Sequence, residues 1–158
     1  MFDVADRHEI LNVIAAYAHL VDNYKIDEWI ALSTPDAIWE VQQPGKEPVR
    51  LTKPQYTAAV QQRFNAFKRT NNQRRHFWGG MYVVSQTTDE AHVFAECLIG
   101  GSVQGKVWKQ ETASEYEFFL RKIDGEWKIN NWITRFDSDV QPGDESAPLT
   151  TYQFRRCE

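Results

Sequence analysis

The sequence predicts an α+β fold in which three N-terminal helices close one face of a curved antiparallel sheet. Apolar residues recur at helical spacing up to about residue 70 and alternate at a period of two after residue 73. Helices followed by a run of long strands are typical of a single sheet covered on one face. Long strands curl because sheets twist. The predicted shape is therefore a cone with an apolar interior, which is a natural site for a small molecule.

Three helices are expected in the first half of the chain, because apolar positions there repeat every three to four residues. Thr52 is a good N-cap for the third helix, and Pro54 suits its first turn. The expected helices are Asp6–Tyr24, Ile26–Ser33 and a segment from Thr52 to about Thr70.

Six strands are expected, and turn residues separate them. Residues 42–46, with Pro44 and Gly45, form a turn, residues 104–110 form a loop, and Asp124-Gly125 is typical of a tight hairpin. The expected strands are Ala37–Val41, Val49–Leu51, Arg75–Ser85, Ala91–Val103, Glu111–Ile123 and Glu126–Asp137. Residues 1–137 are thus expected to form one domain. Residues 138–158, rich in Pro, Gly, Ser and acidic residues, are expected to form an extended tail.

Composition excludes several classes of protein. The net charge of −4 over 158 residues argues against a nucleic-acid partner held by phosphate contacts. No apolar run could span a bilayer and no signal peptide is recognised, so we expect no membrane partner and a cytoplasmic protein. Cys97 and Cys157 fit no metal or redox spacing, and no zinc motif or phosphate loop occurs. No metal site is expected.

Asp22 is the most informative residue, because it falls within the apolar arc of the first helix. It projects between Leu11 and Ala15, opposite a polar face that carries His8 and His19. A carboxylate among apolar side chains loses hydration unless another group holds it. Such arrangements are common at functional sites. Two simpler interpretations remain: Asp22 is solvated at the helix end, or it caps the following helix.

Three segments of the chain resemble the SnoaL-like branch of the nuclear transport factor 2-like superfamily, which has a cystatin-like fold. They are YAHLVDNYKIDEWIALSTPDAIWEV, RRHFWGGMYVV and EYEFFLRKIDGEWKI, and the resemblance runs from about Asp6 to Asp137. The branch includes polyketide cyclases, ketosteroid-isomerase relatives and several lyases. The first and third segments are signatures of the fold. In the second, His76-Phe77-Trp78-Gly79-Gly80 resembles the HFxGG strand of scytalone dehydratase.

The resemblance implies roles for four residues. Asp22 matches an aspartate that several of these lyases use, and His76 matches their catalytic histidine. Ser114 matches a serine that holds a catalytic water in scytalone dehydratase. Tyr17 reproduces a Tyr-x4-Asp spacing found in the bile-acid dehydratase of this branch.

Two departures argue against the specific scytalone reaction. Val21 stands where scytalone dehydratase has a tyrosine, and no histidine lies at residues 101–103, where its second catalytic histidine belongs. The Asp–His pair remains. A histidine held by a carboxylate has a fixed tautomer and can remove a proton beside a leaving group or a carbonyl. Such elimination or isomerisation needs no metal or organic cofactor. The alternative for His76 is a strand histidine bound to a backbone carbonyl.

Four further residues are candidates for substrate binding. Trp78 and Tyr82 are expected on the strand face of His76, where they could line the cavity or pack in the core. Tyr116 could donate a hydrogen bond to a substrate oxygen, and Asn131 could bind a polar substituent.

The sequence therefore indicates a cofactor-independent lyase or isomerase that acts on a small hydrophobic cyclic substrate. The alternatives are a polyketide cyclase, or a non-catalytic binding or subunit protein like the small subunits of ring-hydroxylating dioxygenases.

A homo-oligomer, either a trimer or a dimer, is also expected. Trp132 and Phe136 should share a face opposite to that of Trp127 and Ile129. One of these faces would then be an exposed aromatic surface, with Trp132 near the contact. The alternative is a monomer whose helices cover that face.

Overall fold

The computed structural model describes residues 3–138, and its elements lie in the predicted order, which confirms the α+β fold. Of the expected tail, residues 139–158 lie outside the described residues. The helices are α1 (Val4–Asp22), α2 (Ile26–Ala31) and α3 (Lys53–Thr70). The strands are β1 (Ser33–Gln42), β2 (Val49–Thr52), β3 (Gln73–Gln86), β4 (Glu90–Val103), β5 (Val107–Ile123) and β6 (Glu126–Phe136).

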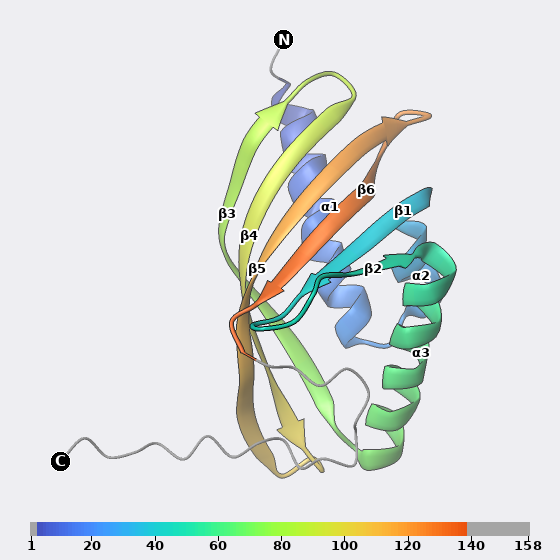
Figure 1. Cartoon of the computed structure of the whole chain (residues 1–158). Coiled ribbons are helices and arrows are strands. Elements are labelled where there is room, and N and C mark those ends of the chain that lie inside the picture. Colours follow the sequence, from blue (N-terminus) through green and yellow to red (C-terminus); the bar gives the residue numbers. More distant parts are fainter. Residues whose placement is uncertain (1–2, 139–158) are drawn as a thin grey trace, which may run out of the picture.

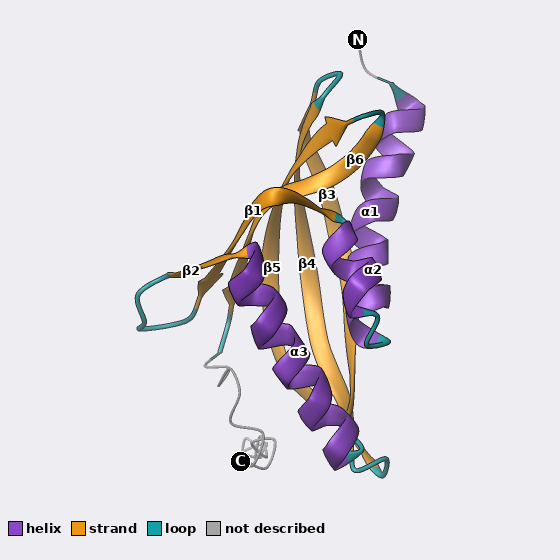
Figure 2. Ribbon diagram, turned by 90° about the vertical axis from the view of Figure 1, so that its right-hand side faces the viewer, coloured by secondary structure: helices purple, strands orange, loops and turns teal. Residues whose placement is uncertain are grey.

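The strands form one curved sheet of six strands in the order β2-β1-β6-β5-β4-β3. Neighbouring strands run antiparallel except β1 and β6, which are parallel, with Trp39 beside Trp132. This parallel pair departs from the expected all-antiparallel sheet, because the last strand returns beside the first after a long crossover. All three helices lie on one face of the sheet, so the core fills the space between them and the strands (Figures 1 and 2).

Local signals explain where two of the helices begin. The Asp3 side chain accepts a hydrogen bond from the Ala5 backbone N–H at 2.8 Å, which caps α1. Gln55 Oε1 accepts from the backbone N–H of Thr52 at 2.9 Å, and Pro54 occupies the first turn of α3, as predicted. Within residues 3–138, no helix combines the length and the apolar character needed to cross a bilayer.

Two strands, β1 and β5, begin four residues earlier than predicted. β1 starts at Ser33, but its pairing with β6 is irregular between Ser33 and Ile38. Pro35 lies in this stretch and has no N–H to donate to the neighbouring strand. β5 starts at Val107, because Gln104 (φ 53°) and Gly105 (φ 67°) form a tight turn in place of the expected loop. Two successive residues with positive φ are typical of the turns that join antiparallel strands closely.

A β-bulge in β6 corrects the predicted position of Trp132. Ile129 pairs with Leu120 and Asn131 pairs with Phe119, which leaves Asn130 as one extra residue in β6. Because side chains alternate along a strand, one extra residue brings all later residues to the opposite face. Trp132 therefore shares the inner face with Trp127 and is only 1% exposed. The prediction that it lies at an exposed contact is wrong.

The core is rich in aromatic rings around Trp132. Its ring stacks on Trp39 at a centroid distance of 5.8 Å and meets the edge of Tyr56 at 4.9 Å. Tyr17 from α1 and Trp29 from α2 complete the cluster, each in an edge contact with Trp132. These contacts tie both helices and β1 to the bulged strand, so the bulge positions the centre of the core.

We predict that Trp132→Ala destabilises the protein by about 3–5 kcal/mol, because it opens a large cavity in a packed core. Trp108→Ala is the matched control, since Trp108 is 52% exposed, and its cost should stay within about 1 kcal/mol. Urea denaturation of the two variants measures both values. A loss for Trp132→Ala as small as that of the control would contradict the buried placement.

Candidate functional site

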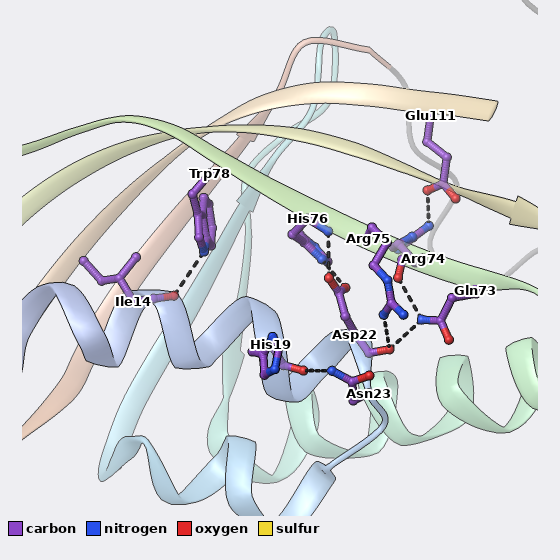
Figure 3. Close-up of polar contacts among 10 residues, drawn as sticks. All are labelled: Ile14, His19, Asp22, Asn23, Gln73, Arg74, Arg75, His76, Trp78 and Glu111. Atoms are coloured by element: carbon purple, nitrogen blue, oxygen red, sulfur yellow. Dashed lines mark hydrogen bonds and ion pairs between the residues drawn. The ribbon is translucent and has the colours of Figure 1, made fainter. Parts of the chain in front are cut away.

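The carboxylate of Asp22 is buried against His76 (Figure 3). Asp22 is the last residue of α1 and is 6% exposed, whereas His76 lies on the inner face of β3. Asp22 Oδ1 is 2.6 Å from His76 Nδ1, and Oδ2 accepts the backbone N–H of His76 at 2.8 Å. Both carboxylate oxygens thus bind one residue of the sheet, which satisfies the buried charge.

The backbone of Asp22 is also held by β3. Its carbonyl oxygen accepts hydrogen bonds from Gln73 Nε2 at 2.6 Å and from Arg75 Nη1 at 3.2 Å (Figure 3). The last carbonyls of a helix have no partner within the helix, and a cation is favourable at that end. The end of α1 is therefore fixed to the sheet by four hydrogen bonds that involve Asp22.

This geometry excludes the simpler interpretations of both residues. Asp22 neither faces solvent nor caps α2, whose N-cap residue is Lys25 without a side-chain hydrogen bond. The Nδ1 partner of His76 is a carboxylate and not a backbone carbonyl. Because an ionised carboxylate only accepts, Nδ1 carries the proton and Nε2 carries the lone pair. Nε2 has no hydrogen-bond partner among residues 3–138 and is therefore free to accept a proton.

Two adjoining cavities lie inside the cone. Asp22 and His76 border the smaller one, of about 30 Å³, which is room for about one water molecule. The larger one, of about 200 Å³, is lined by apolar side chains of β1, β2, α3 and β6, by Arg63, and by Gln43, Lys46 and Glu47 between β1 and β2. The residues that border both cavities are Trp39, Arg63 and Phe136. Of these two cavities, the larger one has room for a ring of a ligand, and it adjoins the water-sized space at the Asp–His pair.

Two tyrosines close the smaller cavity as neutral donors. Tyr17 and Tyr116 both border it, and each is at most 4% exposed. Burial raises the pKa of both hydroxyls well above the usual range. The neighbouring Tyr116 hydroxyl adds to the rise in the pKa of Tyr17. Both therefore stay protonated at neutral pH and can donate a hydrogen bond to an oxygen in the cavity.

The sequence suggested that Trp78 and Tyr82 share one face of β3, but in the structure they lie on opposite faces. Trp78 faces inward and donates from Nε1 to the Ile14 carbonyl at 3.1 Å, so it packs against α1 (Figure 3). The pairing of β3 with β4 shifts by one residue between Gly79 and Tyr82, at Gly80 with φ of 52°. This bulge turns Tyr82 to the outer face, where it is 63% exposed. Tyr82 therefore cannot line the cone.

Ser114 and Asn131 also differ from expectation. Ser114 is buried on the inner face of β5, but its hydroxyl is directed to the Cys97 carbonyl at 3.5 Å and it does not border the cavity of the Asp–His pair. Asn131 follows the bulge in β6, and its Oδ1 accepts the backbone N–H of Ile38 at 3.1 Å. Asn131 thus joins β6 to β1, and neither residue reaches the smaller cavity.

Arg63 is the site residue that sequence reasoning missed. It lies in α3 between Val60 and Phe67, and it borders both cavities. Burial lowers the pKa of its guanidinium from 12.5 to about 10, and the positive charge of Arg74 adds to this effect. Its position within the apolar stripe of a helix is the same signal that singled out Asp22.

No cluster of three His, Cys, Asp or Glu residues suited to a metal occurs within residues 3–138. The one described cysteine, Cys97, is buried, and burial together with the charge of Asp22 raises its thiol pKa to about 12. Cys97 is thus a neutral core residue rather than a nucleophile.

Several solved structures share this fold. The chain is similar to an NTF2-like protein with a cystatin-like fold from Novosphingobium aromaticivorans, with 19% identity, 92% of this chain and 91% of that chain covered, and a TM-score of 0.70. It is similar to ActVI-ORFA from Streptomyces coelicolor, with 18% identity, 85% and 98% coverage, and a TM-score of 0.70. It is also similar to the β subunit of a proposed aromatic-ring-hydroxylating dioxygenase from Novosphingobium aromaticivorans, with 16% identity, 93% and 100% coverage, and a TM-score of 0.73. At these identities the likeness shows the fold alone.

Sequence comparison identifies the family. No curated protein matches the chain. The sequence profile of the SnoaL-like domain, however, matches residues 3–133, which include all three helices and nearly all of the sheet. The chain therefore belongs to the SnoaL-like family, within the group of proteins with the NTF2-like, cystatin-like fold.

Proposed function

We propose that the protein is a cofactor-independent lyase or isomerase that acts on a small hydrophobic cyclic substrate. One observation carries the proposal: His76 is held by the buried Asp22 carboxylate through Nδ1, and its unpaired Nε2 belongs to a residue that borders a cavity. A base that is fixed in one tautomer and shielded from water is suited to abstract a proton from carbon.

In the proposed elimination, Nε2 of His76 removes a proton from the carbon beside a ring carbonyl. The electrons of the broken C–H bond form a C=C bond as a hydroxyl leaves the next carbon. The new Nε2–H proton goes to this hydroxyl, which departs as water. Asp22 stabilises the transient imidazolium without accepting a proton, and Tyr17 or Tyr116 donates to the carbonyl oxygen. In an isomerisation, the proton returns to another carbon.

The larger cavity is the proposed place for the substrate ring. Its walls include Val41, Leu51 and Ala59, which offer apolar surface to a flat ring. Trp39 and Phe136 continue from this cavity into the smaller one, so a ring that rests on them directs its polar edge toward the Asp–His pair. The size of the cavity favours a substrate of one or two rings.

A binding or subunit protein is the second candidate. The observation that favours it is the close filling of the cone around His76, which leaves room for only about one water molecule. The similarity to a dioxygenase β subunit belongs to the same candidate. A polyketide cyclase is the third candidate. A cyclase could use the same proton transfer.

We predict that the protein accelerates loss of water from bicyclic β-hydroxy ketones, with formation of 1-naphthol from 3-hydroxy-1-tetralone as the fluorescence assay. His76→Ala should lower the rate by ~10²–10⁴-fold, because it removes the base. Asp22→Asn should lose a large part of the rate by misorienting the imidazole.

The chain supplies a matched control for these variants. His92 Nε2 is 2.8 Å from Glu117 Oε1, which makes a second His–carboxylate pair away from the cone. His92→Ala should leave the rate unchanged. The proposal fails if no bicyclic β-hydroxy ketone loses water faster with the protein than in buffer, or if His76→Ala and His92→Ala lower the rate equally.

We also predict that His76 carries its proton on Nδ1 in the free protein. Nitrogen-15 NMR of the histidine side chains should show this tautomer for His76 and should show it lost in Asp22→Asn, because an amide no longer demands a donor at that position. A proton on Nε2 in the wild-type protein would contradict the proposed base.

We propose further that the protein is a cytoplasmic homo-oligomer, a trimer or a dimer, joined through an outer patch that consists of Phe77, Leu98 and Trp108. Phe77 pairs with Leu98 across β3 and β4, and its ring lies 5.7 Å from that of Trp108. Each side chain is 42–52% exposed, and exposed apolar patches commonly mark interfaces.

Light scattering should give a multiple of the chain mass of 18.4 kDa, and Leu98→Glu should lower the mass toward that of one chain. Glu96→Gln, a neighbour on the same strand, is the control and should change nothing. A wild-type mass near 18.4 kDa would rule out the oligomer.

A further inference from the structure

Arg63 is a cationic side chain inside the cone with no partner of opposite charge. It comes from the face of α3 that also carries the buried residues Val60 and Phe64, and it borders both cavities. Within residues 3–138, no carboxylate, hydroxyl or carbonyl forms a hydrogen bond or ion pair with Arg63. Arginine stems often pack on apolar surface while the charged group reaches water. Arg63 is half-buried, and it borders the two cavities between α3 and the sheet.

The neighbouring charges do not compensate Arg63. Glu111 interacts electrostatically with Arg63, but its carboxylate is already paired with Arg74, with Oε2 2.5 Å from Arg74 Nη2. Asp22 is bound by His76 through both carboxylate oxygens. Burial lowers the pKa of Arg63 to about 10, so its guanidinium is still charged at pH 7. Even a half-buried charge without a partner loses hydration, and an anionic ligand would offset this loss.

We propose that Arg63 binds a carboxylate of the ligand, so that the substrate class is an apolar ring that bears a carboxylate. This inference deepens the proposed function and rests on it for the reaction, although the binding can be tested by itself. A guanidinium presents two parallel N–H donors to a carboxylate, which fixes the orientation of the ring as well as its affinity.

The two cavities explain how this contact would orient the ring. Val41, Leu51 and Ala59 contact the ring in the larger cavity, and Arg63 holds the carboxylate at the junction. Since Arg63 and His76 border the same water-sized space, the ring carbon nearest the carboxylate faces Nε2 of His76. Arg63 is thus assigned to substrate binding and the choice of substrate, while His76 performs the proton transfer.

The experiment compares a carboxylate with its uncharged amide. Binding of 2-naphthoate and 2-naphthamide to the full chain at pH 7 is measured by isothermal titration calorimetry. The wild-type protein should bind the naphthoate at least tenfold more tightly. Arg63→Met should abolish this preference, and Arg63→Lys should retain part of it. Arg69→Met, an exposed position on α3, is the matched control and should retain all of it.

Two further measurements separate the possible causes. The midpoint of thermal unfolding of Arg63→Met without ligand should equal or exceed that of the wild type, because the variant loses a half-buried charge that has no partner. If Arg63→Met does not fold, Arg63→Gln takes its place and should likewise lose the preference for naphthoate. The comparison of naphthoate with naphthamide in the wild-type protein needs no variant. His76→Ala should keep the preference for naphthoate, so that failure of the proposed reaction leaves the binding result intact.

Equal binding of acid and amide by the wild type, or binding of neither, would overturn the inference. A preference for naphthoate that persists in Arg63→Met would overturn it as well, since another group would then hold the carboxylate.

Discussion

The buried hydrogen bonds between Asp22 and β3 are the contact on which the site depends. A carboxylate at the end of α1 would be too costly inside the cone without the two N–H groups of His76. Gln73 and Arg75 fix the backbone of the same residue, so the helix can end in only one place relative to the sheet. The imidazole is thereby held in one tautomer by the contact that also docks α1 on the sheet.

This docking determines what surrounds the imidazole. Tyr17 lies five residues before Asp22 on the same helix and meets Tyr116 from β5, with a ring centroid distance of 6.1 Å. Trp78, two residues after His76, anchors β3 to the middle of α1. The base therefore lies among neutral aromatic side chains, and the charge that α3 contributes to the cone comes from Arg63. A fixed base on β3 and an unpaired cation on α3 favour a ligand with an acidic C–H bond and an anionic group.

Sequence patterns predicted the helices, the strands and the burial of Asp22, because these follow from periodicity. They failed at single-residue bulges: one extra residue beside Gly80 turned Tyr82 outward, and Asn130 turned Trp132 inward. Such insertions leave little trace in the alternation of side chains, since both faces of these strands carry aromatic residues. The parallel pairing of β1 with β6 is a long-range choice that no local pattern records. Arg63 was open to prediction, because it interrupts the apolar stripe of α3 as Asp22 interrupts that of α1.

The central claim is that Asp22 acts on the reaction only through His76. A double-mutant cycle tests it most directly, with turnover of one responsive ketone measured for Asp22→Asn, His76→Ala and the double variant. If Asp22 only orients the imidazole, the double variant should be no slower than His76→Ala alone, because there is no ring left to orient. If the losses of the two single variants multiply in the double variant, Asp22 acts independently of His76, and the proposed pair would be contradicted.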